Sequence, residues 1–401
     1  MNKKGGGLPV LILTFGVFGI LNTEMGVVGM LPLIADAFRV TVPQAGWTVT
    51  VFALVIAVCG PVTPVLFSRF NRKTVMLLAL GVFIISNVVS MLTRDFAVLL
   101  VARAIPAMLH PVYVSMAFTV AAASVAREDA PKAVARVFIG VSAGMVLGVP
   151  AASLIASEVS CGAAMLFFAV VNGGVFLATL LYIPSMPATG RLSCREQLRV
   201  LRKPVLRQAV GAAVFTNGAA FGFFSYLSDY LRNVTDLPFT VVSVVLLVYG
   251  AANIVGNVLA GRLLAADARR TIRLTPLALA VVLALLFPLG GRFVPMLGLV
   301  LLFGILTGLS SNNSQYMISS TAPEAPEFAN GLFLTAANSG TAMGTALCGV
   351  FISALDIRWA VAGALICLAA ATFAIFTATR AVPSSERSGP AESLPCGEAS
   401  R

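Results

Sequence analysis

Long apolar segments alternate with short polar segments along almost the whole chain. A helix needs about 20 apolar residues to cross the hydrocarbon core of a bilayer, and twelve such segments can be placed in this sequence. The pattern therefore predicts an all-α membrane protein with 12 transmembrane helices. The expected segments include 9–35, 47–67, 75–93, 96–123 and 137–157 in the first half, and 209–231, 241–265, 294–319, 329–355 and 359–379 in the second.

The segment 185–208 interrupts this pattern with basic residues, prolines and a glycine, and it divides the chain into two halves. The halves echo each other, since a basic turn with Arg69 follows the second apolar segment and one with Arg262 follows the eighth. Internal duplication of this kind is typical of transporters whose site lies between the repeats. We expect pseudo-symmetric six-helix bundles over 1–184 and 209–380 around a central cavity, a cytoplasmic linker over 185–208 and a disordered cytoplasmic tail over 381–401.

Composition and charge support a membrane protein rather than a nucleic-acid-binding one. Hydrophobic residues make up 58% of the chain and charged residues 11%, whereas soluble domains carry roughly 25% charge. Most of the 27 lysines and arginines fall in alternate loops, so the net charge of +11 reflects positive-inside topology with both termini cytoplasmic. The six cysteines lack metal or disulfide spacing, and no catalytic or ATP-binding motif occurs, so we expect no cofactor and no enzyme.

Three ionisable residues lie inside apolar segments. Arg103 and His110, the single histidine, are about two helical turns apart and share one face of a helix, and Glu24 is the only acid deep in a segment. Ionisable groups at membrane depth usually face a polar interior and mark a pathway. Glu24 is therefore our candidate proton carrier, with Arg103 and His110 as its partners. A fixed ion pair between two helices and a role in substrate binding alone are the alternatives.

Amide side chains gather in the second half of the chain. The segment Ser310–Gln315 reads SSNNSQ, and polar side chains in an apolar helix must face a cavity or another helix. A neutral lining of this kind suits an uncharged polar solute, and hydrogen bonding between helices is the alternative. The candidate solute-binding residues are Asn217, Tyr226, Asn253, Asn313, Gln315 and Asn338.

Two further motifs are candidates for gating. Glycines recur every four residues before Pro150, at Gly140, Gly144 and Gly148. This spacing predicts close helix packing and permits a gate at this helix. The basic turn with Arg69, Arg72 and Lys73 either caps helix C-termini or only sets the topology.

Taken together, these motifs resemble the drug:proton antiporter branch of the major facilitator superfamily, and within it the arabinose-type sugar and purine-nucleoside efflux permeases. The likeness spans about 8–380. NTEMGVVGMLPLIADAF resembles the family's opening motif with its acid, here Glu24. LLVARAIPAMLHPV resembles the segment with Arg103 and His110, and GMVLGVPAAS the antiporter motif with Gly144, Gly148 and Pro150. YGAANIVGNVLAGRL, SQYMISS and AANSGTAMG resemble the eighth, tenth and eleventh helices.

The turn after the second segment departs from the family pattern, because Ser68 replaces the acid of the family's latch and Asn71 replaces a glycine. The resemblance implies a monomeric transporter in the bacterial inner membrane that exports a sugar, nucleoside or drug-like solute in exchange for protons. Proton-coupled uptake and a non-transporting membrane sensor on the same scaffold are the alternatives.

Overall fold

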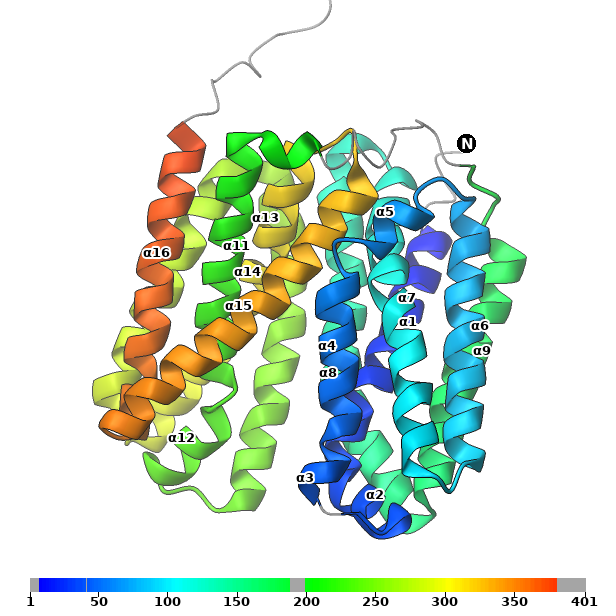
Figure 1. Cartoon of the computed structure of the whole chain (residues 1–401). Coiled ribbons are helices and arrows are strands. Elements are labelled where there is room, and N and C mark those ends of the chain that lie inside the picture. The colour runs from blue at the N-terminus through cyan, green and yellow to red at the C-terminus, as the bar shows by residue number, and fades with distance from the viewer. Residues whose placement is uncertain (1–6, 41, 188–198, 381–401) are drawn as a thin grey trace, which may run out of the picture.

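The computed structural model describes residues 7–40, 42–187 and 199–380, and every regular element in these ranges is helical. The long helices run side by side between two ends of the molecule (Figure 1). We name the end where the described chain begins and finishes the terminal end, and the end with α2 and α12 the distal end. The elements are α1 (Gly7–Met25), η1 (Gly26–Met30), α2 (Leu31–Phe38), α3 (Val42–Ala45), α4 (Trp47–Cys59), α5 (Thr63–Phe67), α6 (Arg72–Leu92), α7 (Phe96–Ala123), η2 (Arg127–Asp129), α8 (Ala130–Glu158), α9 (Cys161–Tyr182), η3 (Val200–Arg202), α11 (Pro204–Phe224), α12 (Leu227–Asn233), α13 (Phe239–Leu289), α14 (Phe293–Thr321), α15 (Pro326–Ala354), η4 (Ile357–Trp359) and α16 (Ala360–Arg380).

The predicted all-helical membrane protein is confirmed, although the helices are divided differently from the apolar segments. Within the described ranges, eight helices are long and apolar enough to cross a membrane, or nine if α11 and α12, bent by 40°, form one span. Two expected crossings are joined in α13, a run of 51 residues that contains the non-helical Asp267 (φ −154°, ψ 90°). The second expected segment is broken after Cys59, which leaves α4 with 13 residues.

Side-chain caps fix where several helices begin. Asn71 accepts a hydrogen bond from the backbone N–H of Lys73 at 3.0 Å, so the residue that replaces the family's glycine starts α6. Asp95 caps α7 in the same way through the N–H of Ala97 at 2.7 Å. These caps satisfy backbone donors that the first turn of a helix leaves unpaired.

The predicted linker and tail lie partly or wholly outside the described residues. Residues 188–198 and 381–401 are not described, so the tail and the middle of the linker are untested. The end of the linker is helical, because α11 begins at Pro204 rather than at the expected residue 209. Proline suits the first helical position, where its missing N–H would be unpaired anyway.

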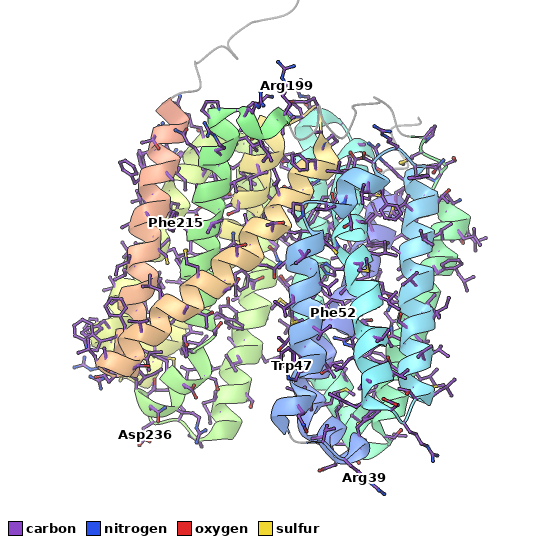
Figure 2. All side chains as sticks on the ribbon, viewed as in Figure 1. Arg39, Trp47, Phe52, Arg199, Phe215 and Asp236 are labelled. Atoms are coloured by element: carbon purple, nitrogen blue, oxygen red, sulfur yellow. The ribbon has the colours of Figure 1, made fainter. Side chains whose placement is uncertain are left out.

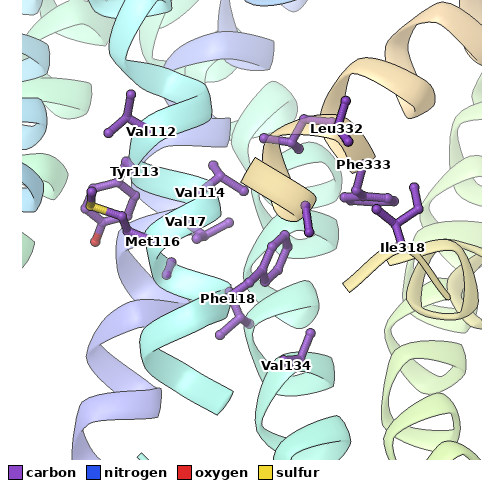
Figure 3. Close-up of a cluster of buried hydrophobic side chains, with 14 of the residues drawn as sticks. Val17, Val112, Tyr113, Val114, Met116, Phe118, Val134, Ile318, Leu332 and Phe333 are labelled. Atoms are coloured by element: carbon purple, nitrogen blue, oxygen red, sulfur yellow. The ribbon is translucent and has the colours of Figure 1, made fainter. Parts of the chain in front are cut away.

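Buried apolar side chains form one core shared by the two halves and one core within each half. The shared core includes Phe118 of α7, Phe138 of α8 and Phe333 of α15. Figure 3 shows part of this core, with Phe118 and Phe333 labelled. The ring of Phe138 stacks on that of Phe118 at 4.7 Å between centroids and meets that of Phe333 at 5.8 Å. A second core is built from residues between Ala219 and Leu368, and a third from residues between Val27 and Phe168.

Candidate functional site

The structure brings the three predicted coupling residues together inside the first half. Glu24 lies near the end of α1, and His110 lies in the middle of α7. The carboxylate oxygen Oε2 of Glu24 is 3.0 Å from Nε2 of His110. Their exposed fractions are 8% and 4%, and that of Arg103 is 2%, so all three are shielded from solvent. This group is defined below as the Glu24 site.

Arg103 contacts the backbone of α1 and α4 rather than the carboxylate. Its guanidinium donates from Nη1 to the carbonyl of Thr23 at 2.7 Å, from Nη2 to that of Glu24 at 3.0 Å, and from Nε to that of Thr48 at 3.3 Å. The same group lies 4.6 Å from the ring centroid of Phe52. Because α1 ends just beyond Glu24, its last carbonyls lack helical donors, and Arg103 supplies them.

Two asparagines on other helices extend the polar surroundings of this site. Nδ2 of Asn172 on α9 donates to Oγ1 of Thr23 at 3.0 Å, and Nδ2 of Asn87 on α6 lies 3.4 Å from the same oxygen. Neighbouring Asn22 is fully buried, and neither of its amide atoms has a hydrogen-bond partner among the described residues. These residues were not predicted from the sequence, although single asparagines inside apolar segments are a signal of buried polar contacts.

The predicted solute-binding residues do not meet at one place. Asn217 donates to Ser314 Oγ at 3.4 Å, and Asn313 donates to Thr275 Oγ1 at 2.9 Å, both inside the second half. The other four residues lie at separate places. Tyr226 donates to the carbonyl of Thr345, and Gln315 donates to Asn330. Asn253 accepts a hydrogen bond from Ser142 of the first half, and Asn338 is exposed on α15.

Asn253 belongs to a hydrogen-bond network that joins α8 to α13 and α14. Ser142 Oγ donates to Asn253 Oδ1 at 2.6 Å and accepts from Asn257 Nδ2 at 2.7 Å. Asn312 Nδ2 donates in turn to Asn257 Oδ1 at 2.8 Å. Each amide is engaged, so in this conformation the network holds the two halves together.

Gln315 belongs to a second polar contact between the halves, nearer the terminal end. Its amide donates to Asn330 Oδ1 at 2.7 Å, and the amide of Asn330 donates to Thr119 Oγ1 of α7 at 3.1 Å. The hydroxyl of Ser115 also donates to the backbone carbonyl of Glu327 at 2.5 Å. The start of α15 is therefore hydrogen-bonded to the end of α7.

The glycines of α8 pack directly against α1. A Cβ atom at Gly144 would lie 2.7 Å from the Cβ of Leu21, and one at Gly140 would overlap the carbonyl of Thr14. One at Gly148 would overlap the amide of Asn22, and Pro150 follows as an exposed residue of α8. The predicted close packing is confirmed, and the gating role stays a prediction.

The basic turn supplies an ion pair across the two halves. Nη2 of Arg72 lies 2.6 Å from Oε1 of Glu327, a residue that is 6% exposed in the first turn of α15. Lys73 donates to the carbonyl of Leu180 at 2.7 Å and thereby caps the end of α9, as one interpretation of the turn expected. Arg69 is exposed. The acid that meets the basic turn thus comes from α15 and not from position 68.

Glu324, an acid in the loop just before α15, pairs with Lys203 at 2.5 Å. Burial raises the pKa of this carboxyl, but the hydrogen bond and positive charge of Lys203 outweigh burial and leave the pKa below its usual value. Glu324 is therefore ionised at neutral pH, and the short loop before α15 is tied at two points.

Comparison with known proteins gives one consistent family. The profile of the Major Facilitator Superfamily matches residues 13–345 and 210–400. The chain is 29% identical over 349 residues to the inner membrane transport protein YdhP of Escherichia coli K12, covering 86% of this chain and 89% of YdhP. It is also 29% identical over 356 residues to the MFS-type transporter YtbD of Bacillus subtilis, covering 87% and 90% of the two chains.

Solved structures agree on the fold. The human organic anion transporter MFSD10 superposes with a TM-score of 0.76 at 16% identity, covering 92% of this chain and 99% of MFSD10. FucP in its outward conformation superposes with a TM-score of 0.77 at 14% identity, covering 93% and 99%.

Proposed function

Since this chain belongs to the major facilitator superfamily, whose members are transporters and not enzymes, we propose that it exports a small organic solute in exchange for protons by alternating access. Its relatives are inner membrane transporters, and its apolar helices fit a multi-pass protein of that membrane. The observation that carries the proposal is the buried contact between Glu24 and His110. The solute is a sugar, nucleoside or drug-like compound, and the transporter is a monomer.

The Glu24 site supports proton exchange through the way its contacts depend on charge. The carboxyl oxygen of Glu24 lies 3.0 Å from the imidazole of His110, so a proton added to or removed from Glu24 changes the electrostatic interaction between the two groups. Arg103 keeps the end of α1 in place through backbone carbonyls, so Glu24 can change partner while the helix stays anchored. A carboxyl with charge-dependent partners can accept a proton in one conformation and release it in another.

The arrangement we propose has twelve crossings in two six-helix bundles, over 1–184 and 209–380, with both termini cytoplasmic. At about 1.5 Å per residue, the 51 residues of α13 extend over more than twice the roughly 30 Å of a hydrocarbon core. The break at Asp267 divides α13 into two crossings. Arg199 of the basic linker lies at the terminal end, opposite Arg39 and Asp236 (Figure 2), so we place the terminal end in the cytoplasm.

The contacts support an outward-facing conformation. At the terminal end, α15 packs on α4, α5 and α7, and Gly331 lies so close to Gly60 that a Cβ atom at Gly331 would be 2.6 Å from the carbonyl oxygen of Gly60. Toward the distal end, α15 diverges from α4 (Figure 1). The ion pair of Arg72 with Glu327 then acts as the cytoplasmic latch.

The predicted solute contacts fall into three groups by exposure in this conformation. Asn338 is exposed midway along α15, and we propose it as a first contact for a solute entering between α15 and α4. Tyr226, in the turn between α11 and α12, is partly exposed and bonds to α15, and Asn253 of α13 is partly exposed and bonds to α8 of the first half. Asn217, Asn313 and Gln315 are buried and already hydrogen-bonded, so they reach a solute only after the helices rearrange.

A flux measurement on purified protein tests this proposal. Sugars, nucleosides and antibiotics are first screened for ligands that raise the unfolding temperature. Each hit is then loaded into proteoliposomes, and an imposed pH gradient is expected to drive the solute against the direction of proton movement. Movement of solute and protons in the same direction would instead show symport, and flux that ignores the pH gradient would contradict proton coupling.

The ion pair of Arg72 with Glu327 can be tested by reversing first one charge and then both. Reversing one charge, in Arg72→Glu or Glu327→Arg, is expected to lower proton-driven flux at least about tenfold, because an unpaired buried charge disfavours the closed cytoplasmic face by more than about 1.4 kcal/mol. The double variant restores the pair and is expected to recover most of the flux.

The surface pair of Lys132 and Asp129, 2.7 Å apart and exposed, provides the control for this experiment. Its reversal is expected to leave flux unchanged, since exposed pairs contribute little. Equal flux for wild type and both single latch variants would contradict the latch.

A further inference from the structure

The aromatic ring of Phe52 on α4 contacts both α7 side chains of the Glu24 site (Figure 2). The guanidinium carbon of Arg103 lies over this ring, 4.6 Å from its centroid. The imidazole of His110 meets the same ring edge to face, with 6.1 Å between the centroids and 80° between the planes. Phe52 is 1% exposed, so water does not separate these groups. One ring therefore contacts both residues that the sequence predicted as partners of Glu24.

The contact with Arg103 has the geometry and the surroundings of a strong cation–π interaction. A guanidinium within about 6 Å of a ring centroid is attracted by the electron-rich face of the ring, and the attraction is stronger where the pair is desolvated. Arg103 is 2% exposed, and its N–H groups donate to backbone carbonyls. Those N–H groups lie in the plane of the guanidinium, so its face is left for stacking on an aromatic ring. The ring thus stabilises the buried positive charge from a direction in which the guanidinium has no donor.

Helix α4 meets Arg103 at two points one helical turn apart. Nε of Arg103 donates to the carbonyl of Thr48 at 3.3 Å, and Phe52 follows Thr48 by four residues, on the same face of α4. The same helix borders the proposed solute entrance, where α15 diverges from α4 toward the distal end (Figure 1). A displacement of the α7 side chains therefore acts on a helix beside that entrance.

We propose that Phe52 is a positioning residue that transmits the protonation state of Glu24 to α4, an inference that rests on the proposed proton exchange. A proton gained or lost by Glu24 changes its interaction with His110, and the ring that packs on this imidazole and on Arg103 follows the change. Among the described residues, the charged or titratable side chains that contact the ring are these two, both from α7. From α6, the ring of Phe83 adds an apolar contact with 6.4 Å between centroids.

Fluorinated phenylalanines incorporated at position 52 test the proposal. Fluorine withdraws electrons from the face of the ring and changes its size little, so it weakens a cation–π interaction in steps. Proton-driven solute accumulation in proteoliposomes and the unfolding temperature in detergent should both fall as one, two and three fluorine atoms are added. With three fluorine atoms, accumulation should be about tenfold below that of wild type, which corresponds to about 1.4 kcal/mol. Phe52→Leu, which keeps an apolar side chain but has no ring, should lose at least as much.

Phe83 provides the matched control, because it is a fully buried phenylalanine that contacts Phe52 and, among the described residues, lies over no cation. The same fluorine series at position 83 should leave both measurements unchanged. The fluorine series keeps the ring, so it decides the matter even if Phe52→Leu fails to fold.

Two results would overturn the role of Phe52. If wild type accumulated solute under a pH gradient and the series at position 52 were as flat as the series at position 83, the proposed proton exchange would stand and the ring would only fill space. A stepwise fall in unfolding temperature without any loss of accumulation would show that the contact with Arg103 stabilises the fold but does not transmit the state of Glu24.

Discussion

Glu24→Gln is expected to lose most of the proton-driven flux while solute binding persists. Glutamine has nearly the same shape as glutamate, but it cannot gain or lose a proton in the relevant pH range. Coupling free energies between binding sites typically correspond to factors of about 5–150, so a comparable loss in pH-driven accumulation is expected. The measurement is solute accumulation in proteoliposomes with and without a pH gradient, beside a binding isotherm for the same variant.

Glu158→Gln is the matched control, because Glu158 is an exposed acid at the end of α8. It should behave as wild type in both measurements. If Glu24→Gln accumulated solute normally under a pH gradient, the contact with His110 would be a fixed structural pair. His110→Gln should retain binding but alter the pH at which flux is half-maximal, because Glu24 would lose the imidazole that lies 3.0 Å from its carboxyl group.

Arg103→Ala is expected to produce the largest loss of stability. It leaves the carbonyls of Thr23, Glu24 and Thr48 without their donor in a buried site, at about 1–3 kcal/mol for each unsatisfied group. The unfolding temperature in detergent should fall by about 5 °C or more. Arg103→Lys should recover only part of this, since one ammonium group cannot reproduce the fork of the guanidinium.

Arg94→Ala removes an exposed arginine from the turn before the same helix and should leave the unfolding temperature unchanged. A wild-type unfolding temperature for Arg103→Ala would mean that water or another side chain replaces the guanidinium at the end of α1. Measuring flux in Arg103→Lys separates a role of Arg103 in stability from a role in positioning Glu24, because stability can recover while the geometry around Glu24 does not.

The sequence predicted the contact of Glu24 with His110 but not the partners of Arg103. Charged groups in apolar helices are few, so each has few possible side-chain partners, and pairing could be inferred from their types. Two of the three carbonyls that Arg103 binds, those of Thr23 and Glu24, become available because α1 ends beside Glu24, and the apolar pattern continues past that point without a break. Where a helix ends inside a membrane depends on tertiary packing and not on local hydropathy.

The latch acid and the solute-binding residues show a second reason for incomplete prediction. Glu327 lies 255 residues from Arg72 in sequence, and no spacing rule relates such distant positions. Amides such as Gln315 require a partner wherever they are buried, but the sequence does not reveal whether that partner is a solute or another helix. Here the partner of Gln315 is Asn330.

Helix α8 contacts α1 on one side and α13 on the other, so it can transmit a displacement of α1 at Glu24 to the second half of the chain. One face presses Gly144 onto Leu21 of α1, three residues before Glu24, and the other hydrogen-bonds through Ser142 to Asn253 of α13. Because α8 has no side chain at Gly144 to absorb a displacement, we expect α1 and α8 to move together at this contact. A shift that starts at the acid therefore crosses a single helix width, about 10 Å, before it moves the opposite half of the molecule.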